Sequence, residues 1–145
     1  MPQEISKFMT EDHKKCDEVF SELENSILNK KTDGIEKKFE EVSNDFLRHF
    51  KMEEEVMFPA FEARTGMSEG PTQVMRMEHN QMKHVIYQME DDIKKGDYDH
   101  FLGLSETFII LVQQHNAKEE QMLYNMMDQA LEDIEAETVE KMKNI

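Results

Sequence analysis

The sequence predicts an all-α fold, an up-down-up-down antiparallel four-helix bundle with an internal duplication of two helical hairpins and a short C-terminal helix. Three observations predict it. The 145 residues include only five Gly and three Pro, so long stretches are free of helix breakers. Apolar residues recur at alternating spacings of three and four, which mark one helix face. One polar pattern also occurs twice, 66 residues apart. The length suits a single domain over residues 1–145.

Turn residues divide the chain into five helices. Breaks at residues 30–34, 65–71 and 96–99 leave helices near 6–30, 34–63, 71–95 and 99–130, and a shorter acidic one near 132–143. Asp33 followed by Glu36 is typical of an N-cap with a capping box, and Gly96 stands where a helix-ending glycine belongs. Pro59 lacks a backbone donor, so we expect the second helix to kink or end near Phe58.

Each long helix carries one inward stripe. The first stripe is Met9, His13, Cys16, Phe20, Leu23 and Ile27, and the second is Ile35, Phe39, Val42, Phe46, His49, Glu53, Val56 and Ala60. The third is Met75, His79, Met82, Ile86, Met89 and Ile93, and the fourth is Phe101, Ser105, Phe108, Val112, His115, Glu119, Met122 and Met126. Such stripes are the core-facing seams of a four-helix bundle. Four histidines and two glutamates therefore face the core.

These polar seam residues repeat as a set. The pattern H-x-x-x-E at 49–53 recurs at 115–119, and the histidine at 13 recurs at 79. The midpoint between His13 and His49 is residue 31, that between Glu53 and His79 is 66, and that between His79 and His115 is 97. All three midpoints fall inside the expected turns. Antiparallel helices therefore place all six side chains in one layer, about 27 Å from the first and third turns at 1.5 Å per residue.

A layer of buried imidazoles and carboxylates requires a positive partner. A carboxylate buried alone is strongly destabilising, and no Lys or Arg lies on a seam to neutralise it. Four imidazoles and two carboxylates around one centre are a ligand set for two transition-metal ions. The sequence thus predicts a metal site of His13, His49, Glu53, His79, His115 and Glu119. Four aromatic residues, Phe50, Phe58, Phe61 and Tyr124, are expected to pack around the layer and secondarily to shield it.

Composition excludes several other functions. A formal charge of −15 argues against nucleic acid and against anionic membrane surfaces. No apolar run approaches a membrane span, and the N-terminal residues lack a signal-peptide core. The single cysteine, Cys16, cannot form an internal disulfide and is expected in the core. We therefore expect a cytoplasmic protein.

The arrangement H…H-x-x-x-E…E-H…H-x-x-x-E resembles the hemerythrin-like (HHE cation-binding) family over nearly the whole chain. The matching segments are D-H at 12–13, H-F-K-M-E-E at 49–54, M-F-P at 57–59, E-H at 78–79 and H-N-A-K-E-E at 115–120. The resemblance implies two iron ions bridged by an oxygen atom and by Glu53 and Glu119. The four histidines would be terminal ligands, which leaves one position open for a diatomic ligand.

The chain departs from the oxygen-carrying members of that family at one place. Those members have a further histidine four residues after the third one, where this chain has Lys83 and then His84. A spacing of five turns His84 about 140° away from His79, onto the outer face. Glu54 and Glu120, each one residue past a predicted bridging glutamate, are likewise expected to be rotated off the seam.

Two kinds of function fit this site. The first is a non-haem di-iron protein that binds oxygen or nitric oxide for sensing, storage or buffering. The alternative is a di-iron enzyme or iron donor in oxidative or nitrosative stress, acting in peroxide or nitric oxide detoxification or in iron–sulfur cluster repair. A histidine-rich set favours ligand binding over turnover, by analogy with the carboxylate-rich ferroxidase centres of other helical bundles.

Overall fold

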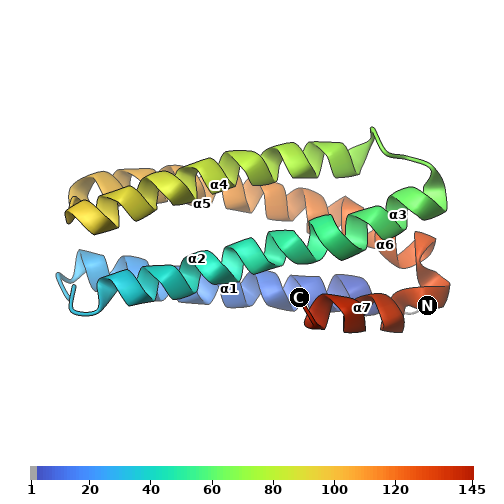
Figure 1. Ribbon diagram of the computed structural model, residues 1–145, viewed down its shortest axis with the longest axis horizontal. Helices are drawn as coiled ribbons and strands as arrows, with labels where there is room; N and C mark the ends of the chain where they lie inside the picture. The colour runs from blue at the N-terminus through green and yellow to red at the C-terminus, as the bar shows by residue number, and fades with distance from the viewer. Residues whose placement is uncertain (1–2) are drawn as a thin grey trace.

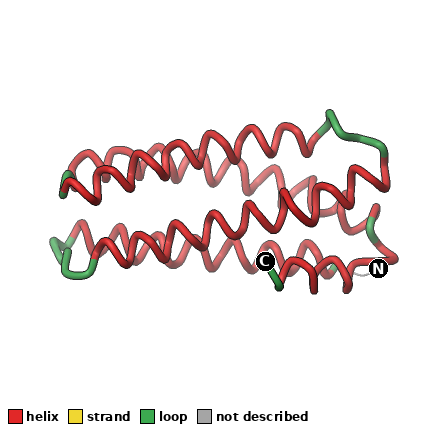
Figure 2. Tube along the Cα trace, viewed as in Figure 1, coloured by secondary structure: helices red, strands yellow, loops and turns green. Residues whose placement is uncertain are grey.

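The computed structural model describes residues 3–145 and consists of helices joined by short turns. The α-helices are α1 (Glu4–Leu28), α2 (Ile35–Met52), α3 (Phe58–Thr65), α4 (Pro71–Lys95), α5 (Tyr98–Lys118), α6 (Tyr124–Ala130) and α7 (Glu135–Lys143). Two π-helical turns, η1 (Glu53–Met57) and η2 (Glu119–Leu123), join α2 to α3 and α5 to α6, and a 3-10 turn, η3 (Glu132–Ile134), precedes α7. The helices form four long rods: the first is α1, the second is α2 with η1 and α3, the third is α4, and the fourth is α5 with η2 and α6. These rods lie side by side, and successive rods reverse direction along the long axis (Figure 1). Their connections lie at the two ends of the bundle (Figure 2).

Backbone conformation at the turns explains where two of the rods begin and end. Gly96 has φ 71° and its N–H binds the carbonyl of Ile93, which confirms it as the glycine that ends α4. The capping box expected from Asp33 is wrong. The N-cap is instead Gly34, with φ 70°, which has no side chain to cap the helix; the Ile35 N–H binds the carbonyl of Thr32.

The second rod does not end near Phe58. It runs through Pro59 to Thr65, and its winding changes in η1, where the Phe58 N–H binds the carbonyl of Glu53 five residues earlier. The fourth rod makes the same change in η2, although no proline is present there. Proline is therefore not the cause of the π turns. What the two turns share is a glutamate as first residue.

The π turns shift the inward stripe by one residue. The stripes expected beyond the glutamates, Val56 with Ala60 and Met122 with Met126, are wrong. Met122 is 64% exposed, and the other three side chains are only half-buried. The core positions are instead Met57, Phe58, Phe61, Leu123, Tyr124 and Met127. A π turn inserts one extra residue into the helix, so the spacing of three and four no longer predicts the face beyond it.

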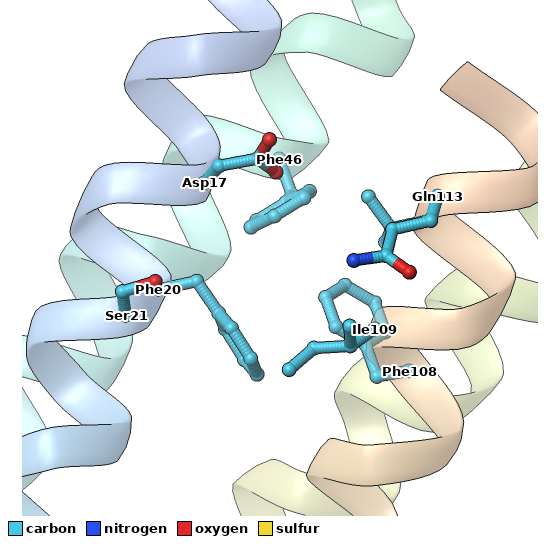
Figure 3. A pocket seen from close by; sticks show the side chains of 8 residues that line it. Asp17, Phe20, Ser21, Phe46, Phe108, Ile109 and Gln113 are labelled. Carbon is cyan, nitrogen blue, oxygen red and sulfur yellow. The ribbon is translucent and has the colours of Figure 1, made fainter. Parts of the chain in front are cut away.

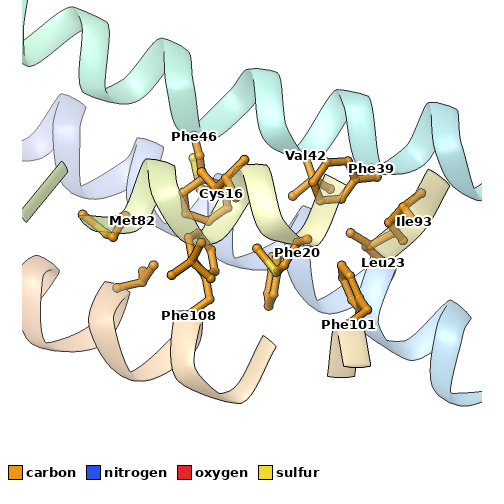
Figure 4. Packing of buried hydrophobic residues seen from close by; sticks show 14 of the residues in the cluster. Cys16, Phe20, Leu23, Phe39, Val42, Phe46, Met82, Ile93, Phe101 and Phe108 are labelled. Carbon is orange, nitrogen blue, oxygen red and sulfur yellow. The ribbon is translucent and has the colours of Figure 1, made fainter. Parts of the chain in front are cut away.

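The core consists of two hydrophobic clusters. One fills the half of the bundle at the end that carries the α1–α2 and α4–α5 turns. There Phe20, Phe39, Phe46, Phe101 and Phe108 pack against aliphatic side chains (Figure 4). The other fills the opposite half and contains most of the buried methionines. The six polar residues predicted as a site lie between the two clusters.

Helix α7 packs along α1 and η1 and fixes both chain ends to the bundle (Figure 1). Asp128 and Glu135 accept hydrogen bonds from the first backbone N–H groups of α1, those of Ser6 (3.2 Å) and Ile5 (3.4 Å). Burial and the neighbouring Asp128 carboxylate raise the pKa of Glu135 to about 7. At the other end of α7, Arg48 donates to the carbonyl of Ile145 (3.3 Å). Within residues 3–145, no helix combines the length and apolarity required to cross a membrane.

Candidate metal centre

Four histidines and two glutamates meet in one buried layer of the bundle. The histidines come one each from α1, α2, α4 and α5, and the glutamates are the first residues of η1 and η2. The residues are His13, His49, Glu53, His79, His115 and Glu119, and none is more than 3% exposed. The structure therefore brings together all six residues that the sequence singled out.

The layer has two halves that share the glutamates. His13 and His49 face each other with ring centroids 4.6 Å apart, and His79 and His115 do so at 4.9 Å. Glu119 Oε1 lies 3.0 Å from His13 Nε2 and 3.3 Å from His115 Nε2, so this carboxylate touches both halves.

Glu53 makes the mirrored contacts. Its Oε1 lies 3.0 Å from His79 Nε2 and 3.7 Å from His49 Nε2. Each glutamate is therefore placed between one histidine of either half.

The outer nitrogen of every histidine contacts a carboxylate on a neighbouring helix. The Nδ1 pairs are His13–Glu120, His49–Asp12 and His79–Glu54, each at 2.7 Å, and His115–Glu78 at 2.8 Å. An Nδ1–H that donates to a carboxylate fixes both the ring orientation and the tautomer. All four rings then turn their Nε2 atoms inward, toward Glu53 and Glu119.

These four carboxylates form a closed circuit around the bundle, which we call the carboxylate belt. Asp12 links the first rod to the second, and Glu54 links the second to the third. Glu78 links the third to the fourth, and Glu120 links the fourth back to the first. Each rod thus supplies one histidine and one carboxylate.

The belt was not among the expectations from the sequence. Glu54 and Glu120 were expected to be rotated off the seam; they are half-buried and exposed, respectively, and both nevertheless accept a hydrogen bond from a histidine of the layer. The sequence does contain a signal for the belt, because four layer residues have an acidic neighbour: D-H at 12–13, E-E at 53–54, E-H at 78–79 and E-E at 119–120. The pairs cross between helices, so the neighbour of one histidine serves another.

Electrostatics leave this layer short of positive charge. Burial alone lowers the pKa of His13, but its hydrogen bond to Glu119 and the nearby carboxylate charges raise that pKa to about 9. The pKa of His79 rises to about 9 in the same way, through Glu53. Burial and the charge of Glu119 raise the pKa of Glu53. Burial also acts to raise the pKa of Glu119, but its interactions with Glu53, His115 and His13 together hold that pKa well below the usual value. The layer therefore attracts protons or another cation.

Tyr124, the first residue of α6, enters the layer five residues after Glu119. Its hydroxyl oxygen lies 2.8 Å from Glu53 Oε2 and 3.0 Å from Glu119 Oε1. It also lies 3.1 Å from His13 Nε2 and 3.4 Å from His49 Nε2. Tyr124 was expected to pack around the layer and secondarily to shield it. Its hydroxyl contacts were not expected, because five residues along a regular α-helix point away from Glu119 and only the π turn brings the ring back.

An apolar hollow of about 200 Å³ lies next to the layer, between α1 and α5 (Figure 3). Phe20, Phe46, Phe108 and Val112 form its walls, and polar side chains that include Asp17 stand at its edge. Phe46 and Val112 each precede a layer histidine by three residues, about one helical turn. The wall of the hollow therefore lies about one helical turn from His49 and His115.

The donor atoms of the layer fit a metal. Four of its buried atoms, Glu53 Oε1, Glu119 Oε2, His79 Nε2 and His115 Nε2, have no hydrogen-bond partner within residues 3–145. Buried polar atoms are otherwise almost always paired. Two sets of ligand atoms lie close enough together to hold an ion, one on Glu53, His79, His115 and Glu119 and one on His13, His49 and Glu119. Imidazole nitrogen and carboxylate oxygen are donors that iron accepts.

The model of the hemerythrin HHE cation-binding domain matches residues 4–127 of this chain. The chain belongs to that family. Searches among curated proteins and among solved structures found no match. Membership implies a helical protein that binds a metal, usually iron, and the His/Glu layer of this hemerythrin-like domain could hold one.

Two further residues distinguish this hemerythrin-like domain from the oxygen-carrying pattern. His84 is exposed, as its spacing from His79 predicted. Lys83, which takes the place of the additional histidine, extends toward the belt, with its Nζ 3.5 Å from Glu54 Oε2. Cys16 is buried, and burial raises the pKa of its thiol, so it is a core residue as expected.

Proposed function

We propose that the layer holds two iron ions and that the protein binds a diatomic ligand, oxygen or nitric oxide, for sensing, storage or buffering. His13 and His49 would hold one ion and His79 and His115 the other, with Glu53 and Glu119 shared. The observation that carries this proposal is the set of unpartnered inward atoms, backed by a belt that orients every histidine. Bound iron supplies reversible electron transfer and a coordination position for the ligand.

The chain itself contributes a dry and oriented site. The belt keeps each Nε2 inward. Aromatic rings exclude water around His79 on the third rod: the ring centroid of Phe50 lies 4.3 Å and that of Phe58 5.9 Å from the centroid of the His79 ring. The apolar hollow beside the layer suits a small, weakly polar molecule on its way in, because its walls offer few hydrogen bonds to water.

Two broader points follow from the same layer. We propose that the two helical hairpins are copies of each other, because belt carboxylates and π turns recur 66 residues apart with matching contacts. A cytoplasmic location remains our expectation, in keeping with a single buried cysteine.

Elemental analysis and substitution test the metal site. The protein purified after growth with iron should contain about two irons per chain and show the absorption of a bridged ferric pair. Glu119→Ala removes a shared carboxylate and should reduce iron to one or none per chain. His84→Ala changes an exposed histidine and should retain both. A single zinc per chain, or loss of iron in His84→Ala, would contradict the proposal.

Stopped-flow spectroscopy distinguishes the two kinds of function. The reduced protein is mixed with oxygen, nitric oxide or peroxide and followed through several additions. A reversible adduct with oxygen or nitric oxide supports ligand binding. Repeated consumption of nitric oxide or peroxide indicates the alternative, a detoxifying enzyme, and transfer of iron to an apo acceptor indicates an iron donor.

A further inference from the structure

The two halves of the layer differ at one pair of positions. Tyr124 follows Glu119 by five residues, and Phe58 follows Glu53 by five, so the two π turns place them equivalently. The Tyr124 ring stacks on His13 at 5.5 Å and 28°, and the Phe58 ring stacks on His79 at 5.9 Å and 16°. One half of the layer therefore has a phenolic oxygen where the other has only a ring edge.

The Tyr124 hydroxyl stands among the donor atoms of its own half. Four acceptor atoms, two carboxylate oxygens and two histidine Nε2 nitrogens, lie 2.8–3.4 Å from its oxygen. A hydroxyl has one proton and can donate to only one of them. At least one of the two carboxylate oxygens therefore contacts the phenolic oxygen without a proton from Tyr124, and a bound cation would stabilise that contact.

The side chain of Tyr124 is held in place by its packing and cannot move away from the layer when a cation binds. Its side chain is 0% exposed and packs in the second hydrophobic cluster with Leu123 and Met127 on the same rod. A cation held by His13 and His49 would therefore lie beside the phenolic oxygen, because that oxygen is within 3.4 Å of both Nε2 atoms.

We propose that Tyr124 is a seventh ligand of the centre and coordinates the iron held by His13 and His49 as a phenolate. The inference rests on the proposed di-iron function and deepens it. The phenolic O–H bond breaks, its proton leaves to solvent, and the oxygen electron pair forms the bond to iron, with no change in oxidation state. Tyrosine oxygen is an established iron ligand in haem proteins.

The consequence is an unequal pair of iron sites. The half with Tyr124 has one more donor than the half with Phe58, so the open position for a diatomic ligand lies on the iron held by His79 and His115. The apolar Phe58 ring, 0% exposed, stacks on His79 and would lie beside an iron held there.

Resonance Raman and visible absorption spectroscopy of the ferric protein test the assignment. A ferric phenolate gives a visible charge-transfer band whose excitation enhances tyrosine ring vibrations, and the parent protein should show both. Tyr124→Phe keeps the ring and should lose both while retaining about two irons per chain. Of the other tyrosines, Tyr87 is 56% exposed and Tyr98 packs against the first hydrophobic cluster at the start of α5, so neither can supply the signal.

The mirrored substitution is the matched control. Phe58→Tyr in the Tyr124→Phe background moves the hydroxyl to the other half and should restore the tyrosine vibrations. Iron content is measured on every sample first. A parent with two irons and no tyrosine vibrations, or a Tyr124→Phe variant that keeps them, overturns the phenolate assignment and leaves the di-iron function standing. A parent without two irons overturns the proposed function instead.

Discussion

The carboxylate belt should control how tightly iron is held, and its members should differ in a predictable order. Asp12 and Glu120 are the extremes, since their side chains are 13% and 38% exposed. Alanine at either position removes the acceptor of a histidine Nδ1–H. When the lost acceptor is buried, the N–H stays unpaired, whereas at an exposed position water can replace it.

The expected magnitudes follow from this difference. Removing a carboxylate that orients a metal-binding histidine typically weakens metal binding by about 10- to 100-fold. Asp12→Ala, which leaves His49 unpaired in a dry place, should approach a loss of about 100-fold, or about 2.7 kcal/mol. Glu120→Ala should cost about tenfold, or about 1.4 kcal/mol. Glu78 and Glu54, at 19% and 26% exposure, should fall between them in that order.

Competition with an iron chelator measures these losses directly. Each variant is loaded with iron, incubated with increasing chelator, and analysed for iron per chain, while circular dichroism confirms that the helices are intact. Glu55→Ala is the control, because Glu55 is exposed and lies outside the belt. Equal retention of iron by Asp12→Ala and Glu55→Ala would refute the reasoning, and so would a larger loss in Glu120→Ala than in Asp12→Ala.

Three other substitutions probe the core, the C-terminal helix and the hollow. Leu23→Ala should lower the free energy of unfolding by about 3 kcal/mol because the side chain is fully buried, whereas Leu28→Ala, at a 56% exposed position, should change it by less than about 0.5 kcal/mol in the same denaturant titration. The pKa of Glu135 is raised in the folded state from 4.5 to about 7, so the folded state binds an extra proton and the parent loses stability as pH rises through that window. Glu135→Gln should remove this loss and gain up to about 3 kcal/mol over the parent by pH 7, while a Glu132→Gln control that shows the same trend would contradict the assignment. Ile109→Trp should fill the hollow and slow ligand association in stopped-flow measurements without changing iron content, and an unchanged rate would exclude the hollow as the way in.

The sequence was sufficient to predict the layer because its geometry depends only on regular helix. From His13 to Glu53, and from His79 to Glu119, the chain is regular α-helix on both sides of a single turn, so equal heights and common faces could be worked out from spacing alone. Predicting the layer required only approximate positions for the turns. The expected capping box at Asp33 is absent, but this one-residue shift in the start of α2 leaves the seam unchanged.

The rest of the site depends on features that spacing does not encode. The π turns begin at the glutamates themselves, so every face assigned beyond them was displaced by one residue. Tyr124 was consequently assigned to packing, and Met122 to the core. The belt was missed for another reason. Its hydrogen bonds run between helices, and which carboxylate reaches which histidine depends on the distance and rotation of the neighbouring rods.

The closed circuit of the carboxylate belt also constrains motion. A rod that slides along its axis or rotates must break two of these hydrogen bonds at once, one to each adjacent rod. At the level of the layer the four rods are therefore coupled and can only move together. A displacement of one rod at this level is therefore transmitted to both adjacent rods, and through them to the fourth.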